Sequence, residues 1–501
     1  MNRIYYPQFN CEFLIKDPPF ITKDGVTVYG FPYYGTDYLV NGSIKDNLNR
    51  VSGYYFAIFE TDNELIIAND ICGGYRVYYI KSDGGYIFSD DYNCLIDRIK
   101  NKGKLEIDLD QLSYWQKHRF TLDEKTLFKG IKKLSPASYI KISNNEMTVD
   151  SYYRDIERHS NYRLLMKENY DLISNQLKEI YRDNPEKTYL LFYSGGADSS
   201  FLLHILLDNK IPFKCLIMQY HPLCSGNINE VNRAKAYLKH IGINDYDTIE
   251  IDFNEARDRN IEAVLNDMLF DRHTSVHCYE CYRLIREKYG KDVVIINGQT
   301  SDSILSFGPS EQTKGSLIRR AILYTFTGKL MLWPLLRFYM PQLRMPWSKI
   351  SKQIAMLDET NYFYMTDITS TYQNMLIQKL EESLVTRLKS KESLLMYLKL
   401  ISFIQGPDNQ MVIQAARNNG IRNVVMPFTS PGFIYNTVAY KSNIRELFVG
   451  KYFVRDTLKN RFGYKKLQDL KAVELPTDFD ISSFNAEIMR LFTNKIEELA
   501  R

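Results

Sequence analysis

The sequence predicts an α/β protein: an N-terminal antiparallel β-sandwich, then a domain built on a parallel sheet with a helical C-terminal part. Three observations lead to this prediction. Short β-rich runs separated by Gly, Asn and Asp turns fill residues 1 to about 150. From about residue 160, apolar strands alternate with helical stretches, and beyond about 310 the pattern is mostly helical. We therefore expect two domains, residues 1–155 and 156–501.

The N-terminal runs are expected to form a meander of antiparallel strands in one layer of the sandwich. Turn residues at 61–63 and 83–85 separate neighbouring runs, because Gly, Asn and Asp adopt turn conformations readily. The expected strands are 54–59, 64–68, 76–80 and 86–88.

The second domain reads as strands joined by helices, which is typical of a parallel sheet. A helix at 164–181 precedes the first strand. The expected strands are 189–193, 213–218, 248–251 and 293–296, and the expected helices between them include 200–207 and 228–241.

Composition limits the classes of partner. A net charge of +4 over 501 residues leaves no basic stripe, so a nucleic-acid partner is not expected. Seven cysteines without regular spacing, and an N-terminus without a leader's cleavage site, predict a cytoplasmic protein. The apolar stretch 321–340 contains Lys329, Pro334 and Arg337, so we expect buried helices there and no membrane span. Contact with an interface or a hydrophobic substrate remains an alternative for this stretch.

The strongest local signal is the sequence SGGADS at residues 194–199, between an expected strand and an expected helix. Gly195 and Gly196 let the backbone approach a phosphate, whose charge the N–H groups and the helix N-terminus would bind. Ser194 and Ser199 add hydroxyl donors. Asp198 suits such an anion site only if it holds Mg²⁺ that bridges the phosphates. The spacing and lysine of a Walker loop are absent.

This loop resembles the pyrophosphate-binding loop of the N-type ATP pyrophosphatases, and from about residue 50 to 480 the chain resembles asparagine synthetase. Segments 53–57, 69–79 and 125–136 are similar to that family's glutaminase domain. The resemblance implies a class II amidotransferase-like N-terminal domain and an ATP pyrophosphatase domain that uses ATP and Mg²⁺.

Further segments extend the resemblance and imply site residues. Residues 296–303, INGQTSDS, are similar to the family's S-G-[ED]-G-[AS]-D-E, which implies that Asp302 is the second Mg²⁺ ligand and that Gly298 contacts the nucleotide. Residues 425–431 resemble V-x-x-P-F-x-D, and 451–455 resemble K-x-x-L-R. Counting on from Lys451 at the family's spacing puts Lys471 at the catalytic lysine. The alternative is that Lys471 is a surface residue.

Two further contacts concern the substrates. The rule that ligands bind at the carboxyl ends of parallel strands puts adenine near Leu216 and Met218. The resemblance puts Glu230 near the substrate amine, and the alternative is an ordinary acidic residue near a helix N-terminus. Lys471, Gln299 and Glu230 are thus the candidate catalytic residues.

The sequence departs from asparagine synthetase at two positions that matter. Position 2 is Asn2, where glutamine-dependent members have the nucleophilic cysteine, and the nearest cysteine is Cys11. The segment 41–44, NGSI, is only weakly similar to the family's glutamine loop. We therefore expect a shortened, degenerate glutaminase domain without glutaminase activity. Gln299 replaces the family's acidic residue and cannot act as a base at neutral pH, so neither aspartate amidation nor β-lactam closure fits.

His273, His277, Cys278 and Cys281 form a group with three interpretations. They could bind Zn²⁺, they could include redox or sulfur-transfer cysteines, or they could line a core or pocket wall, which their helical spacing favours.

Together these features predict an ATP-dependent ligase that adenylates a carboxylate, releases pyrophosphate and joins the acyl group to an amine. A small molecule, a sugar acid or a peptide could carry the carboxylate, and a partner protein or homodimer is left open. The alternatives are a sulfur-inserting enzyme that uses Cys278 and Cys281, and a non-catalytic binding protein.

Overall fold

The computed structural model describes residues 2–40, 47–268, 273–305, 407–440, 451–464 and 480–501, without 83, 102–104, 119–120, 122–123, 145, 155 and 158. The side chains of Val40, Lys117, His118, His273, Asp302, Ser303 and 407–409 are also outside the description. The predictions for the segments 41–44 and 321–340 and for Lys471 therefore lie outside the described residues.

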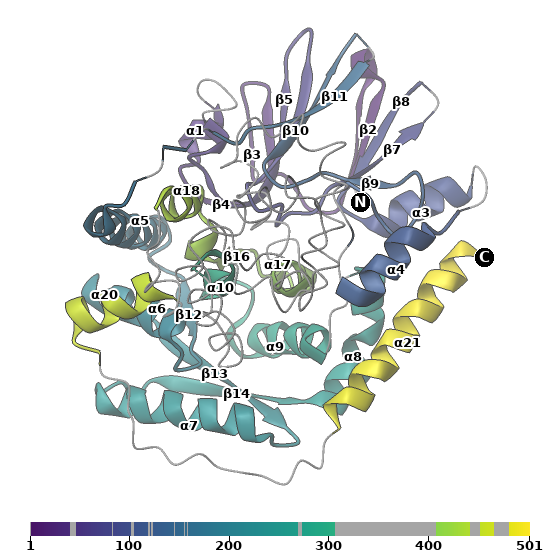
Figure 1. Cartoon of the computed structure of the whole chain (residues 1–501). Helices are drawn as coiled ribbons and strands as arrows, with labels where there is room; N and C mark the ends of the chain where they lie inside the picture. The colour runs from purple at the N-terminus through teal and green to yellow at the C-terminus, as the bar shows by residue number, and fades with distance from the viewer. Residues whose placement is uncertain are drawn as a thin grey trace, which may run out of the picture.

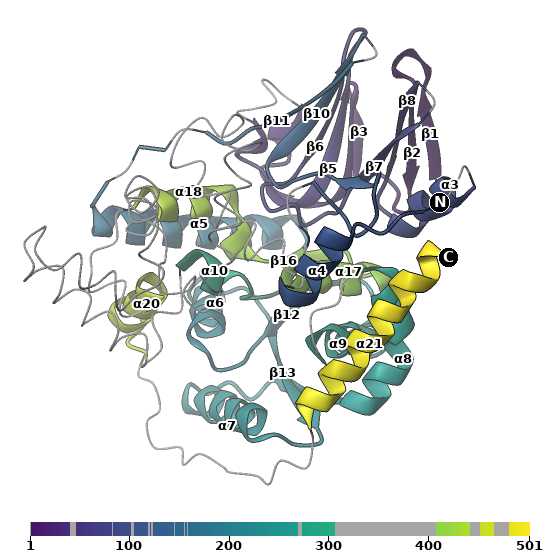
Figure 2. The same cartoon turned by 45° about the vertical axis from the view of Figure 1, so that its right-hand side comes forward.

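Residues 2–151 form two β-sheets, which lie together at one end of the molecule (Figures 1 and 2). The first sheet has, in order, β1 (Asn2–Tyr6), β2 (Cys11–Ile15), β8 (Gly85–Ser89), β7 (Tyr78–Ser82) and β9 (Lys132–Lys133). The second has β11 (Glu146–Ser151), β10 (Ser138–Ser143), β6 (Leu65–Asn69), β5 (Ser52–Glu60), β4 (Val26–Tyr34) and β3 (Ile21–Lys23). The named strands pair antiparallel throughout, except that β2 and β8 are parallel.

The prediction of a single meander was wrong in one respect. β5 and β6 belong to the six-stranded sheet, whereas β7 and β8 belong to the five-stranded sheet. The chain thus changes sheet between Asn69 and Tyr78. Alternation of apolar and polar residues predicts a half-buried strand but does not say which of two facing sheets the strand joins.

The change of sheet is organised around the buried carboxylate of Asp70. Its Oδ2 accepts hydrogen bonds from the backbone N–H groups of Tyr55 (3.2 Å) and Tyr75 (3.1 Å). Its Oδ1 accepts from those of Cys72 (2.9 Å) and Gly74 (3.0 Å). Burial raises the pKa of Asp70 to about 6, and the four donors oppose that rise because they stabilise the charged form. One side chain thereby fixes both β5 and the crossover loop.

Short helices surround these sheets. They are η1 (Pro7–Phe9), α1 (Asp37–Val40), α3 (Tyr92–Lys100) and α4 (Leu109–His118). α3 begins at Tyr92 because Asp91 caps it, accepting a hydrogen bond from the N–H of Asn93 at 2.9 Å.

The second half of the described chain is built on a five-stranded sheet whose pairings are all parallel. Its strands are, in order, β14 (Tyr246–Asp252), β13 (Lys214–His221), β12 (Thr188–Phe192), β15 (Val293–Ile296) and β16 (Asn423–Val425). The chain moves outward from β12 through β13 to β14 and then returns to add β15 on the other side of β12. Ligands bind at such a reversal, at the carboxyl ends of the strands.

The helices of this half are α5 (Tyr162–Asp183), α6 (Ala197–Asp208), α7 (Ser225–His240), α8 (Phe253–Asn266), α9 (His273–Tyr289), α10 (Ser301–Leu305), α17 (Pro407–Asn418), η3 (Pro427–Thr429), α18 (Pro431–Ala439), α20 (Tyr452–Phe462) and α21 (Ile481–Ala500). The predicted α/β class is confirmed, and β15 has the predicted bounds. α6 begins three residues earlier than predicted, so Asp198 and Ser199 lie in its first turn. Among the described helices, none has the length and hydropathy needed to cross a membrane.

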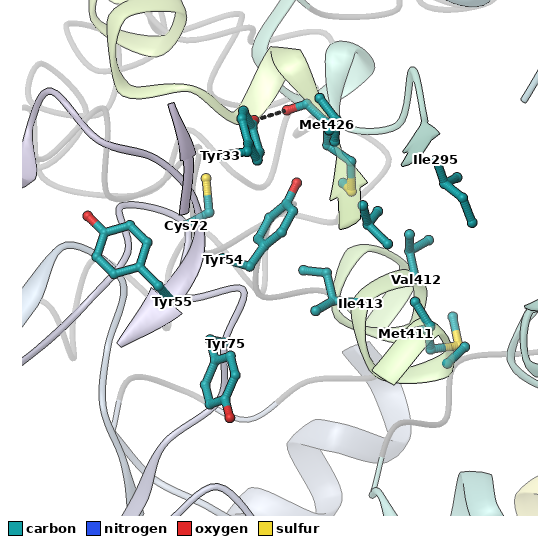
Figure 3. Close-up of a cluster of buried hydrophobic side chains, with 14 of the residues drawn as sticks. Tyr33, Tyr54, Tyr55, Cys72, Tyr75, Ile295, Met411, Val412, Ile413 and Met426 are labelled. Carbon is teal, nitrogen blue, oxygen red and sulfur yellow. Dashed lines mark hydrogen bonds between the residues drawn. The ribbon is translucent and has the colours of Figure 1, made fainter. Parts of the chain in front are cut away.

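The two halves meet at an apolar contact that Figure 3 shows, with Tyr33 and Tyr54 facing Ile413 and Met426. Tyr33 donates a hydrogen bond to the carbonyl oxygen of Met426 at 3.1 Å. A Cβ added to Gly74 would lie 2.2 Å from Cδ1 of Tyr54 and 2.9 Å from Cδ1 of Ile413, so only glycine fits at this position. The close approach of these segments joins the β-sheets to α17 and to the end of β16.

A buried ion-pair cluster beside this contact joins the same two halves. The guanidinium of Arg417, in α17, lies 2.7 Å from Oδ2 of Asp90 and 2.9 Å from Oδ2 of Asp17. It also stacks over the ring of Tyr75, 4.2 Å from the centroid, and the Tyr75 hydroxyl donates to Asp90 at 2.8 Å. Because breaking a buried pair leaves an uncompensated charge, this cluster fixes how α17 sits on the sheets.

We predict that Asp70→Asn lowers the free energy of unfolding by about 2–4 kcal/mol, because the amide nitrogen would face two N–H donors and two hydrogen bonds would be lost. Urea denaturation followed by circular dichroism measures the change. Asp62→Asn, in an exposed turn, is the matched control and should leave the midpoint in place. An equal midpoint for both variants would show that the Asp70 carboxylate does not organise the crossover.

Candidate functional site

The candidate site lies where β12 and β15 end side by side, at the reversal of the parallel sheet. Leu191 of β12 is paired with Ile296 of β15, so the loops that follow them start next to each other. The first loop is residues 194–199 and the second is residues 297–300. Both were singled out from the sequence, and the fold brings them together.

The first loop has a backbone that only glycine adopts at low cost. Gly195 has φ +69°, in the left-handed region, and a Cβ there would lie 3.0 Å from the backbone nitrogen of Ala234. The Ser194 hydroxyl accepts a hydrogen bond from the N–H of Gly196 at 3.2 Å. The Ser194 and Ser199 hydroxyls lie 3.3 Å apart, which closes the loop on itself.

The second loop presses against the first. A Cβ on Gly298 would lie 3.4 Å from both Cβ of Asp198 and the backbone nitrogen of Ser199. Thr300, which leads into α10, has φ +79°. A positive φ is an outlier for a β-branched residue, and such strained positions cluster at functional sites. The two loops thus form one tightly packed surface.

The N-terminus of α6 faces this surface without a capping side chain. Gly196 is the N-cap residue and has no side chain to accept from the first turn, and no side-chain cap is formed. The first N–H groups of a helix carry a partial positive charge and need an acceptor. An anion at this end of α6 would supply that acceptor.

Asp198 forms an ion pair with Lys451, which the sequence places 253 residues further along the chain. Lys451 Nζ lies 2.5 Å from Oδ2 of Asp198, and the side chains are 13% and 15% exposed, respectively. The other oxygen of Asp198, Oδ1, is buried and makes no hydrogen bond among the described residues. An orphaned carboxylate oxygen suits a hard cation such as Mg²⁺, so Asp198 fits the metal that the sequence implied.

Lys451 sits at the N-cap of α20 with φ +49° and ψ +31°, which is left-handed backbone. A non-glycine residue in this region costs of order 1–2 kcal/mol. The side chain of Lys451 does not cap α20, and it extends instead to Asp198. The strained Lys451 therefore brings an ammonium group and a second helix N-terminus to the loop.

α20 and α6 run in the same direction. Lys451 pairs with Asp198 at their N-terminal ends, and Arg461 pairs with Asp208 at 3.0 Å near their C-terminal ends. Ten residues separate the two partners on each helix, a rise of about 15 Å. The second pair is half-exposed and adds little stability by itself. Its geometry nevertheless shows that the positive ends of both helix dipoles converge on Asp198.

Aromatic packing holds α20 in this register. The imidazole of His204, in α6, stacks on Phe462 with ring centroids 5.0 Å apart, and its Nε2 lies 2.7 Å from the Tyr237 hydroxyl. Burial lowers the pKa of His204, which favours the neutral ring that such packing requires. Phe453, in the first turn of α20, packs edge-on against Phe201 at 5.4 Å.

The remaining predicted residues are placed as follows. Gln299 is exposed in the second loop, and its backbone N–H donates a hydrogen bond to Oδ1 of Asn297 at 2.9 Å. The backbone of Asp302 lies in α10, beside the site, while its side chain is outside the description. Leu216 and Met218 lie in β13, which neighbours β12; Leu216 is fully buried and Met218 is half-buried.

Glu230 lies in the second turn of α7, not at its start. Its side chain is 54% exposed, and it faces Arg233 at 3.9 Å. Desolvation by the surrounding protein raises its pKa, while Arg233 acts in the opposite direction. The contact of Glu230 with Arg233 does not connect it to the 194–199 loop, and its proposed contact with the substrate amine stays a prediction.

The histidine and cysteine group on α9 is buried at Cys281 and partly buried at His277 and Cys278. Cys281 is fully buried, and burial raises the pKa of its thiol well above the ordinary value. His277 stacks on Tyr220, with ring centroids 4.9 Å apart. Among the described side chains, no three His, Cys, Asp or Glu are placed to hold a metal ion, and the side chain of His273 is not described. The core-wall interpretation therefore has the most support.

The three cysteines of residues 2–151 have raised thiol pKa values, which disfavour the thiolate. Burial raises the pKa of Cys11 to about 12 and that of Cys94 to about 11. Cys72 is fully buried, and its pKa is raised well above the ordinary value for the same reason. Since the thiolate is the nucleophile, these residues are poor candidates for glutamine hydrolysis.

Lys451 is the site residue that sequence reasoning missed. Its match to the start of K-x-x-L-R predicts a family segment but no contact with Asp198. No local pattern indicates that a lysine so far along the chain pairs with Asp198. That contact depends on the docking of α20, which is a long-range feature.

Comparisons with known proteins agree with part of this picture. Residues 38–153 match the glutamine amidotransferase domain, so the match covers most of the two N-terminal sheets but begins after Asp37. No curated protein matches the sequence. The match covers less than half of the chain and leaves the parallel sheet without a family assignment.

Solved structures give weaker matches. The NMN synthetase from Francisella tularensis is 17% identical, with 28% of this chain and 58% of that chain covered and a TM-score of 0.20. The NH3-dependent NAD synthetase from Campylobacter jejuni is 13% identical, with 45% and 96% covered and a TM-score of 0.22. The glutamine phosphoribosylpyrophosphate amidotransferase from B. subtilis is 11% identical, with 56% and 63% covered and a TM-score of 0.18. The chain thus spans about three fifths of the length of the first and third of these proteins, and its similarity to all three is weak.

Proposed function

We propose that this chain is an ATP-dependent ligase of the asparagine synthetase-like type, which adenylates a carboxylate and passes the acyl group to an amine. The observation that carries the proposal is the convergence of the 194–199 loop, the N-termini of α6 and α20 and the Lys451 ammonium at the reversal of a parallel sheet. Such a concentration of positive potential suits a triphosphate.

The loop would bind the β- and γ-phosphates through the N–H groups around Gly195 and Gly196, and the Ser194 and Ser199 hydroxyls would orient them. The Lys451 ammonium would offset charge that develops on the leaving pyrophosphate. The substrate carboxylate oxygen attacks the α-phosphorus, and the bond from that phosphorus to the bridging oxygen breaks. An amine then attacks the acyl carbon, AMP leaves with the bonding electrons, and the amine's extra proton goes to solvent.

Asp198 is the residue that would hold Mg²⁺, with Asp302 as its proposed partner. Magnesium supplies electrostatic stabilisation of the phosphates when it is bound. The buried, unpartnered Oδ1 of Asp198 supports this role. Gln299 would orient a substrate by hydrogen bonds, and Lys471 is the further proposed catalytic cation.

The acceptor and donor are proposed only by class. The carboxylate could belong to a small molecule, a sugar acid or a peptide, because Gln299 argues against the acid/base chemistry that asparagine formation or β-lactam closure would need. No observation favours the sulfur-inserting alternative, since Cys281 is buried and its thiol pKa is raised.

Exchange of radiolabelled pyrophosphate into ATP, across a panel of carboxylic acids, tests the proposal. We expect acid-dependent exchange in the wild type. Asp198→Ala should reduce it by about a hundredfold or more, because a charged group at the phosphates is lost. Asp183→Ala, at an exposed helix end, is the control and should exchange normally. Full activity in the Asp198 variant would refute the assigned role.

A separate prediction concerns the nitrogen donor. Although residues 38–153 match a glutamine amidotransferase domain, we expect no release of glutamate from glutamine, because the described cysteines of that region have raised pKa values. An enzyme-coupled glutamate assay measures this, with and without ATP. Release of glutamate by the wild type would overturn the prediction.

A further inference from the structure

The ion pair between Lys451 and Asp198 occupies the carboxylate that a metal would need. Nζ of Lys451 is 2.5 Å from Oδ2 of Asp198, and both side chains are largely buried. The pair is therefore partly shielded from solvent, where opposite charges attract more strongly than they do in water. In the described structure this ammonium is the cation that neutralises Asp198.

The position of Lys451 is fixed by more than this one contact. Its backbone is held in the left-handed region at φ +49°. The helix that follows is anchored on α6 by Phe453 near its start and by Phe462 and Arg461 near its end. These contacts hold the backbone of Lys451 within reach of Asp198.

A divalent cation that approached the remaining oxygen, Oδ1, would meet this ammonium a few ångströms away. Repulsion between the two cations opposes binding, and one carboxylate oxygen is a poor set of ligands for Mg²⁺, which prefers six oxygens. The phosphates of ATP would change this balance, because they supply further oxygen ligands and negative charge for both cations.

We infer that Lys451 is a resident counter-ion that keeps divalent metal off Asp198 until a nucleotide arrives, so that the metal enters together with ATP. This inference rests on the proposed function for the identity of the ligand. The ion pair would thus set the order of binding. The nucleotide phosphates compete for the Lys451 ammonium, and Asp198 then becomes available to the metal.

Manganese(II) is the probe, and electron paramagnetic resonance of the free ion measures its binding in the absence of nucleotide. We expect weak binding to the wild type. Lys451→Met should bind Mn²⁺ at least tenfold more tightly, a gain of about 1.4 kcal/mol. Lys459→Met, an exposed lysine on the same helix, should behave like the wild type. The double variant Lys451→Met, Asp198→Asn should lose the gain.

Lys451→Gly is a second variant that also lacks the ammonium, and glycine adopts the left-handed backbone without strain, so this variant should fold. It should show the same gain in Mn²⁺ affinity as Lys451→Met. Equal Mn²⁺ affinity in the wild type and both Lys451 variants would overturn the inference, as would a gain that survives Asp198→Asn. Calorimetry of ATP with the wild type separates the two proposals. If ATP does not bind with or without Mn²⁺, the proposed function fails, while the Mn²⁺ comparison still decides the role of the ion pair.

Discussion

The ion pair between Asp198 and Lys451 is the contact on which the site depends. It joins the first turn of α6, which follows the central strand β12, to the start of α20, which belongs to a distant part of the chain. The two helices run parallel, and their aromatic packing and this ion pair together bring both positive helix ends to the same loop. Without α20, residues 194–199 would face the N-terminus of a single helix and would lack the Lys451 ammonium.

The β-sheets at the other end of the molecule act on this site through packing. Asp70 fixes the crossover loop, Gly74 lets that loop approach Ile413, and Arg417 ties the sheets to α17. The next elements along the chain are β16, which pairs with β15, and η3. The region that matches a glutamine amidotransferase domain thus also supports the parallel sheet through these contacts.

Much of the fold was predictable from the sequence, because strand and helix patterns are local. β15 has the predicted bounds, and residues 194–199 and 297–300 lie together as parallel-strand topology requires. The sheet change after Asn69 was not predictable, since it depends on a buried carboxylate that joins the crossover loop to Tyr55 of β5. Lys451 was missed for the same reason: its role comes from how α20 docks. Gln299 and Asp302 were placed beside the site, whereas Lys471 lies outside the described residues.

The central claim is that the backbone of residues 194–199 binds the phosphates of ATP, and calorimetric titration of ATP into Gly195→Ala tests it most directly. A Cβ at Gly195 would meet Ala234 at 3.0 Å and push the loop away, whereas Gly242, with φ +78°, has open space around it. Both alanine variants bear a similar left-handed strain of about 1–2 kcal/mol, so Gly242→Ala controls for stability. The account predicts that Gly195→Ala weakens ATP binding at least tenfold while Gly242→Ala binds like the wild type. Unchanged binding in Gly195→Ala would contradict it.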